Sequence, residues 1–144
     1  MIKQEKTLFL ENISGDSTDQ VYRGAFVFST KLSFSDILKM DRLRRTYLGG
    51  ENQENASQFA VNIANAIADL SVRVIEGPPW WKESNFGLNL KDYNVLNAVY
   101  DLAMLAQKED EEERQKKKQE ASDKLRELST PTPPPPPATS IPNI

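Results

Sequence analysis

Carboxylates are the first side chains to consider for chemistry in this chain, because it contains neither cysteine nor histidine. That absence removes thiolate nucleophiles, thiolate metal sites, the commonest general base and the commonest transition-metal ligand. Two carboxylate pairs, Asp36/Asp41 and Asp92/Asp101, show no spacing that suggests paired acid–base work. The sequence therefore predicts a protein that is not an enzyme, with no catalytic residue, cofactor or metal.

Two other segments lack features of ligand-binding loops. The turn that holds Asn12, Asp16 and Asp19 lacks the regular alternation and the terminal glutamate of a calcium loop. The segment Gly49-Gly50-Glu51 is not followed by the Lys-Ser or Lys-Thr pair that a phosphate loop requires. We interpret these segments as a turn and as the end of a helix.

The pair Trp80-Trp81, directly after Pro78-Pro79, is the sharpest local feature. We expect that two adjacent side chains do not enter the same core, so one indole should pack inward and the other should be partly exposed or covered by a partner. Tryptophan is enriched at binding hot spots. Either both indoles cover the corner between two helices, or one of them is an interface anchor.

Three arginines, Arg42, Arg44 and Arg45, are candidate contact residues. They could meet phosphate groups, but the chain has a formal net charge of −3 and no basic surface around them in the sequence. A solvated face or a salt-bridging subunit contact is therefore favoured, and nucleic-acid binding is disfavoured. No apolar run approaches the roughly 18 residues of a membrane span, so we expect a soluble protein of a cytoplasm without membrane contact.

The elements that must position these residues begin with strands. Residues 1–32 predict a β-hairpin or a small antiparallel sheet, with Glu11–Gln20 as turn. Tyr22, Phe26 and Phe28 share one strand face by their period of two. Because two strands alone are marginal in water, the sheet must pack on helices or on another subunit.

About three helices should follow, which gives an α+β fold. The first is predicted over residues 33–48, where an N-terminal serine and Asp36 resemble a capping box and Gly49-Gly50 ends the helix. The second is predicted over residues 54–74, and the third begins near Asn89. Residues expected on their apolar sides are Phe34, Ile37, Leu38, Met40 and Tyr47, then Ala56, Phe59, Ala60, Ile63, Ala64, Ile67 and Leu70, and then Leu90, Tyr93, Leu96, Val99, Tyr100, Ala103 and Ala106.

The last third of the chain differs in composition. Residues 107–129 carry an acidic block and then a basic block, and residues 130–144 are rich in proline. Such a sequence cannot bury enough apolar surface to offset its ordering entropy. We expect a compact domain over residues 1–106, a charged helical extension over 107–129 and a proline-rich tail over 130–144, whose Ile141 and Ile144 are candidate docking residues.

The central segment, roughly residues 20–106, resembles small bacteriophage morphogenesis proteins, and tail assembly chaperones in particular. The matching elements are Tyr22-Arg23-Gly24-Ala25-Phe26, Leu32-Ser33, Asp41-Arg42-Leu43-Arg44-Arg45 before Leu48-Gly49, Leu70-Ser71-Val72-Arg73-Val74 in an alanine-rich helix, and Pro79-Trp80-Trp81. The resemblance implies a small strand-bearing N-terminal part, several helices and a charged C-terminal extension. It also implies a non-catalytic protein that binds phage structural proteins and prevents their premature assembly.

Two alternatives stay open at this point. The second reading, which ranks after the chaperone, is a structural component of a virion (a head, neck or tail protein) whose C-terminal arm contacts neighbouring subunits. A third class is a cellular adaptor with a polyproline arm. The chaperone reading implies a place in the host cytoplasm during assembly, the second implies the virion, and both imply a homo- or hetero-oligomeric assembly.

Overall fold

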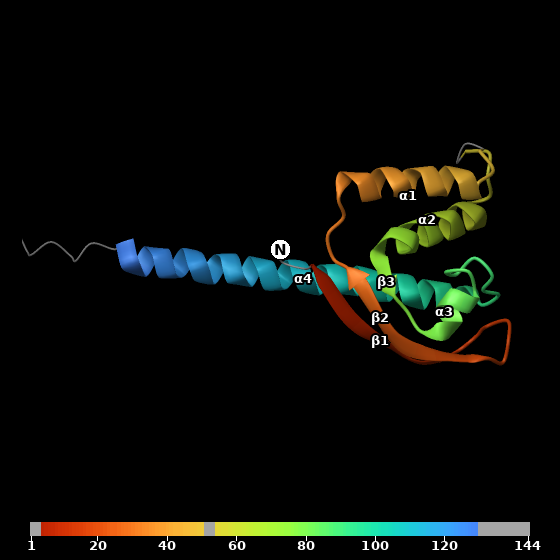
Figure 1. Ribbon diagram of the computed structural model, residues 1–144, viewed down its shortest axis with the longest axis horizontal. Coiled ribbons are helices and arrows are strands. Elements are labelled where there is room, and N and C mark those ends of the chain that lie inside the picture. Colours follow the sequence, from red (N-terminus) through yellow and green to blue (C-terminus); the bar gives the residue numbers. More distant parts are fainter. Residues whose placement is uncertain (1–3, 51–53, 130–144) are drawn as a thin grey trace, which may run out of the picture. The chain divides into compact units, whose positions relative to one another are not determined.

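A computed structural model describes residues 4–50 and 54–129 and confirms the α+β class. The chain divides between Asp110 and Glu111 into a compact first unit and a second unit. Figure 1 shows the order of the elements, which are β1 (Glu5–Ser14), β2 (Val21–Ser29), α1 (Phe34–Tyr47), α2 (Gln58–Arg73), β3 (Val74–Glu76), α3 (Pro79–Glu83) and α4 (Tyr93–Ser129).

The three strands form an antiparallel sheet in the order β1-β2-β3. The predicted face of β2 is confirmed, because Tyr22, Phe26 and Phe28 are all buried. The prediction of a turn from Glu11 onward is wrong for its first four residues, since β1 continues to Ser14. A bulge between Leu10 and Ile13 gives β1 one residue more than β2 at this point, and so the strand accommodates a sequence that looks like a turn.

Helix α1 has the predicted ends. Ser33 and Asp36 form a complete capping box, and Gly49 and Gly50 follow the helix with positive φ angles of 68° and 80°. Its apolar side chains are more exposed to solvent than those of a core helix, since no residue of α1 is buried. Phe34 is 87% exposed and Leu38 is 65% exposed.

Helix α2 begins four residues later than predicted, at Gln58, because Ser57 caps it and accepts a hydrogen bond from the backbone N–H of Ala60. The prediction of its apolar face is correct for Ala64, Ile67 and Leu70 and wrong for Phe59, which is 56% exposed. Strand β3 and helix α3 were not predicted. Both are very short, and α3 starts with Pro79, which suits the first turn of a helix.

Helix α4 supplies the other main part of the core. It begins at Tyr93 rather than near Asn89, and Leu96, Val99, Ala103 and Ala106 are buried as predicted. Val95 is also fully buried, although the predicted stripe omits it. These residues and the buried face of the sheet form one hydrophobic cluster with Ile67, Leu70 and Trp81.

The second unit contains the charged part of α4, from Glu111 to Ser129, and nearly all of its described residues are exposed. The predicted helical continuation through this charged segment is therefore present. The proline-rich tail over residues 130–144, with Ile141 and Ile144, lies outside the described residues.

Candidate functional site

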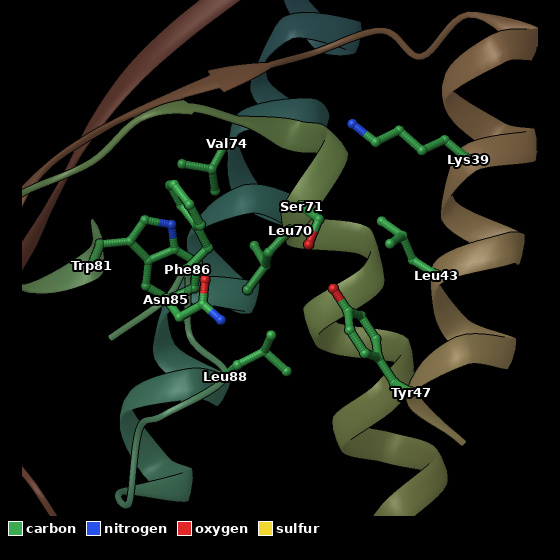
Figure 2. Close-up of a pocket in the computed structure, with 10 residues that line it drawn as sticks. All are labelled: Lys39, Leu43, Tyr47, Leu70, Ser71, Val74, Trp81, Asn85, Phe86 and Leu88. Atoms are coloured by element: carbon green, nitrogen blue, oxygen red, sulfur yellow. The ribbon is translucent and has the colours of Figure 1, made fainter. Parts of the chain in front are cut away.

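A groove opens between α1 and the loop that follows α3, and α2 forms its floor. Figure 2 shows the side chains of Leu43 and Tyr47 on one wall and those of Phe86 and Leu88 on the other. The cavity has a volume of about 310 Å³. Its lining consists of Lys39, Leu43, Tyr47, Leu70, Ser71, Val74, Trp81, Asn85, Phe86 and Leu88.

The floor of the groove is fixed by the hydrophobic core. Leu70 is fully buried and Trp81 is 1% exposed, so both present only their edges to the opening. The hydroxyl of Ser71 donates a 2.7 Å hydrogen bond to the carbonyl of Ile67 and is thus satisfied within α2. The floor therefore offers apolar surface, and its Ser71 hydroxyl already has a hydrogen-bond partner.

One wall of the groove is a loop in an unusual backbone conformation. Asn85 and Phe86 both have φ angles of 55°, and Gly87 follows with 95°. A non-glycine residue in this region carries a strain of about 1–3 kcal/mol, and such residues gather at functional sites. Backbone hydrogen bonds hold the turn, including Phe86 N–H to the carbonyl of Trp81 at 2.9 Å.

The consequence of this loop conformation is exposed apolar surface beside the groove. Phe86 is 50% exposed and Leu88 is 42% exposed. At Gly87 an added Cβ would lie 2.8 Å from the ring of Trp81, so the loop can approach the indole only with glycine there. The strained turn thus presents two large apolar side chains at the rim instead of burying them.

The opposite wall is α1, which contributes one charge. Lys39, Leu43 and Tyr47 follow one another at four-residue spacing and line the groove from the same side of the helix. Figure 2 shows the Lys39 side chain extending from α1 toward the side of α2 and Val74. No carboxylate lines this groove among the described residues, so its electrostatic character comes from a lysine.

The tryptophan pair is arranged as expected, with one indole in the core and the other partly exposed. Trp81 is buried and Trp80 is half-buried, yet both rings make edge contacts with Phe26, at centroid distances of 5.6 and 5.7 Å. The reason is that they lie on the short helix α3, where neighbouring side chains are separated by about 100° and can straddle one aromatic ring. The expectation of one buried and one partly exposed indole is confirmed, although both rings contact Phe26.

Trp80 also has a polar partner. Its indole N–H donates a 2.8 Å hydrogen bond to the carbonyl of Arg23 in β2, and its ring packs against Tyr22. These contacts favour the interpretation that both indoles cover a corner of the fold. Trp81 reaches the groove, whereas Trp80 does not line it.

The three arginines lie on α1, apart from the groove. Arg44 and Arg45 both pair with Asp41, the latter at 2.8 Å, which gives an intrahelical ion-pair cluster. Arg42 is exposed and lines a separate open hollow with Ser35, Leu38 and Arg45. None of the three arginines lines the groove, whose residues Leu43 and Tyr47 lie on the other side of α1.

A buried carboxylate ties the sheet to α4. The Asp92 side chain accepts hydrogen bonds from the backbone N–H groups of Ser17 and Thr18 at 2.8 Å, the Thr18 hydroxyl at 2.7 Å and the Tyr22 hydroxyl at 2.9 Å. The Thr18 bond is the largest influence that lowers the pKa of Asp92 below its ordinary value. Burial and the Asp92 bond raise the pKa of Tyr22. Because every polar atom of this cluster has partners, its role is structural.

A second polar link joins α2 to α4. Arg73 pairs with Asp69 on its own helix and donates a 2.7 Å hydrogen bond to the side chain of Gln107. Burial raises the pKa of Asp69, and the charge of Arg73 opposes that effect. Within residues 4–50 and 54–129, no group of histidine, cysteine or carboxylate side chains is arranged to hold a metal ion, and none of the helices is long and apolar enough to cross a membrane.

Comparison with known proteins gives no match. No protein-family model, no curated protein and no solved structure is similar to this chain. The interpretation of the groove therefore depends on the residues themselves.

Proposed function

We propose that this protein is a non-catalytic binding protein that holds an apolar segment of a client protein in the groove between α1 and the loop after α3. The observation that supports the proposal is the groove itself, whose floor is apolar and whose rim exposes Phe86 and Leu88. Binding sites are characteristically concave and mostly apolar, with a few polar groups that fix orientation. The client's identity follows the resemblance to phage tail assembly chaperones, which bind structural proteins before assembly.

The lining indicates the chemistry of the client segment. A volume of about 310 Å³ accommodates a few apolar side chains and not a whole helix. Lys39 is the charged group at the opening, so an acidic residue beside those apolar side chains is favoured. A segment of this kind is one that a structural protein would bury later against its own neighbours.

A substitution on the groove wall tests this function. Leu43→Asp places a charge among the apolar lining and should weaken client binding by about 2 kcal/mol or more, which corresponds to roughly thirtyfold in affinity. Leu38→Asp is the matched control, because Leu38 lies on the same helix but outside the groove. Thermal unfolding of both variants establishes that each is folded.

The assay is co-expression with each structural protein of the same phage, followed by measurement of the soluble fraction of that protein. The proposal predicts that the wild type and Leu38→Asp keep one of these proteins soluble and that Leu43→Asp does not. If Leu43→Asp protects the client as well as the wild type does, the groove is not the binding site. Mass spectrometry of purified particles then separates the chaperone, which should be absent from them, from the virion component.

A further inference from the structure

The long outer edge of β1 is a second surface that can bind protein, distinct from the groove. β1 contains ten residues and pairs only with β2 among the described residues, so one of its edges has no strand beside it. β3, at the opposite edge, contains three residues. Figure 1 shows β1 at the far side of the compact unit from α1.

The register identifies which backbone groups face the open edge. The backbone N–H of Thr30 donates a 2.8 Å hydrogen bond to the carbonyl of Gln4, its direct partner in the register that pairs Glu5 with Ser29. Hydrogen-bonded pairs alternate along an antiparallel ladder. Lys6, Leu8 and Leu10 therefore direct their N–H and C=O groups toward β2, and those of Glu5, Thr7 and Phe9 point outward.

The side chains of these three residues are also available. Glu5, Thr7 and Phe9 lie on the face of the sheet opposite the core, and Phe9 is 70% exposed. Opposite Phe9 and Thr7 on β2 lie Ala25 and Val27, which are half-buried without being part of the core cluster. An incoming strand would thus find both a hydrogen-bonding edge and an apolar neighbour.

Charge decides between a second copy and a different protein. The exposed face of β1 carries Glu5 on one side of Phe9 and Glu11 on the other. Two copies of β1 paired antiparallel would bring four such carboxylates onto one small face, and like charges across strands are destabilising. A strand with lysine or arginine at the flanking positions and an apolar residue between them fits this edge better.

We propose that the β1 edge binds an extended segment of a partner protein, with alternating basic and apolar residues, as an added fourth strand. Main-chain bonds to Glu5, Thr7 and Phe9 give affinity, and the two glutamates with Phe9 between them select the sequence. This inference does not depend on the groove or on the proposed function.

The experiment uses the full chain and a nine-residue probe peptide. Every second residue of the peptide is threonine, and the residues between are lysine near both ends and valine at the centre. Amide hydrogen exchange is followed by NMR during titration. At saturation the amides of Thr7 and Phe9 should exchange at least about tenfold more slowly, because they gain partners. Those of Lys6 and Leu8 should change little, since they already bond to β2.

Two variants make the result specific. Thr7→Pro removes an outward N–H without disturbing the ladder to β2, as proline is tolerated at such an edge position, and should abolish the protection. Thr7→Val keeps the N–H and should retain it. A probe with glutamate in place of lysine should bind more weakly, by about twofold to fivefold for each replaced charge, which is the range for exposed ion pairs.

The outcomes that overturn the proposal are distinct. Exchange at Thr7 and Phe9 that stays unchanged at millimolar probe contradicts it, and so does equal binding of the lysine and glutamate probes. If sedimentation reveals a dimer that Thr7→Pro dissociates, the edge binds a second copy of this chain, and the proposal of a different partner is overturned.

Discussion

Two regions of the compact unit are held in opposite ways. At the junction between the β1–β2 turn and the start of α4, Asp92 receives four hydrogen bonds, and Asn94 bonds to Asp16 and Ser14 as well. Helix α1 instead contains no buried residue and bonds mainly within itself. The first region specifies the fold, and the second is free to present side chains to another molecule.

This difference shows where binding surface can be found in a small domain. Elements that complete the core leave little accessible apolar area, whereas an element that packs by one side only can keep large side chains exposed. The groove and the exposed residues Phe34 and Leu38 both depend on α1 being such an element. Predictions that separate the two regions should therefore give very different losses of stability.

The largest effect is expected for Trp81→Ala. Trp81 joins the core to the floor of the groove and is 1% exposed, so its removal should destabilise the fold by about 3–5 kcal/mol. Urea or thermal unfolding measures this loss. The exposed neighbour Lys82, replaced by alanine, is the control and should change stability by less than about 0.5 kcal/mol. Similar values for both variants would contradict the position of Trp81 in the core.

Gly15→Ala should give the next largest loss. A Cβ at this position would lie 2.2 Å from the carboxyl carbon of Asp92, so the turn or the carboxylate must move. Overpacking of this kind costs about 1–3 kcal/mol, or a fall in thermal midpoint of about 4–8 °C for each kcal/mol in a domain of this size. Gly49→Ala adds no contact but places alanine at a positive φ, which separates backbone strain from collision. An unchanged midpoint for Gly15→Ala would show that the junction is loosely packed.

The pH dependence of stability tests the Asp92 junction without changing its packing. The folded pKa of Asp92 is lower than its ordinary value of 3.8, so its contribution is fully present above that value and is lost as pH falls through the folded pKa. Asp92→Asn should remove this component of acid unfolding below about pH 4, whereas Asp101→Asn, at an exposed position within α4, should keep it. Identical acid-unfolding profiles for wild type and Asp92→Asn would refute the linkage.

The smallest effect belongs to α1. Phe34→Ser should change the free energy of unfolding by no more than about 0.5 kcal/mol, since the side chain is 87% exposed. Chemical denaturation of the full chain measures it. A loss of more than about 1 kcal/mol would mean that α1 is packed as firmly as the rest of the core, and the contrast between the two regions would disappear.

The sequence predicts the parts of the fold that depend on local patterns. The capping box at Ser33 and the buried face of β2 come from short-range spacing, and both are confirmed. The sequence places the start of α4 near Asn89, before Asp92, whereas the helix begins at Tyr93. The Asp92 side chain accepts hydrogen bonds from Ser17, Thr18 and Tyr22, which are at least 70 positions away in the sequence. Such long-range contacts have no signature in a single sequence.

The groove was only partly predictable for the same reason. Trp81 drew attention through its residue type, but Phe86 and Leu88 did not, since nothing in the sequence shows that two consecutive residues with positive φ would hold them at the surface. Asn85 and Gly87 tolerate that backbone region and indicate a turn, but Phe86 between them gives no such signal. The lining from α1 required the pairing of α1 with α2, which only the structure provides.

The hydrogen bond from Trp80 to the carbonyl of Arg23 makes the two margins of the sheet unequal. It occupies a β2 acceptor where the three residues of β3 have ended, so this margin offers little length for a further strand. Once a partner strand had joined β1, the sheet could therefore not be extended by another molecule at its β3 margin. A protein with such a sheet would bind one partner strand at β1 and would stop a growing sheet instead of propagating it.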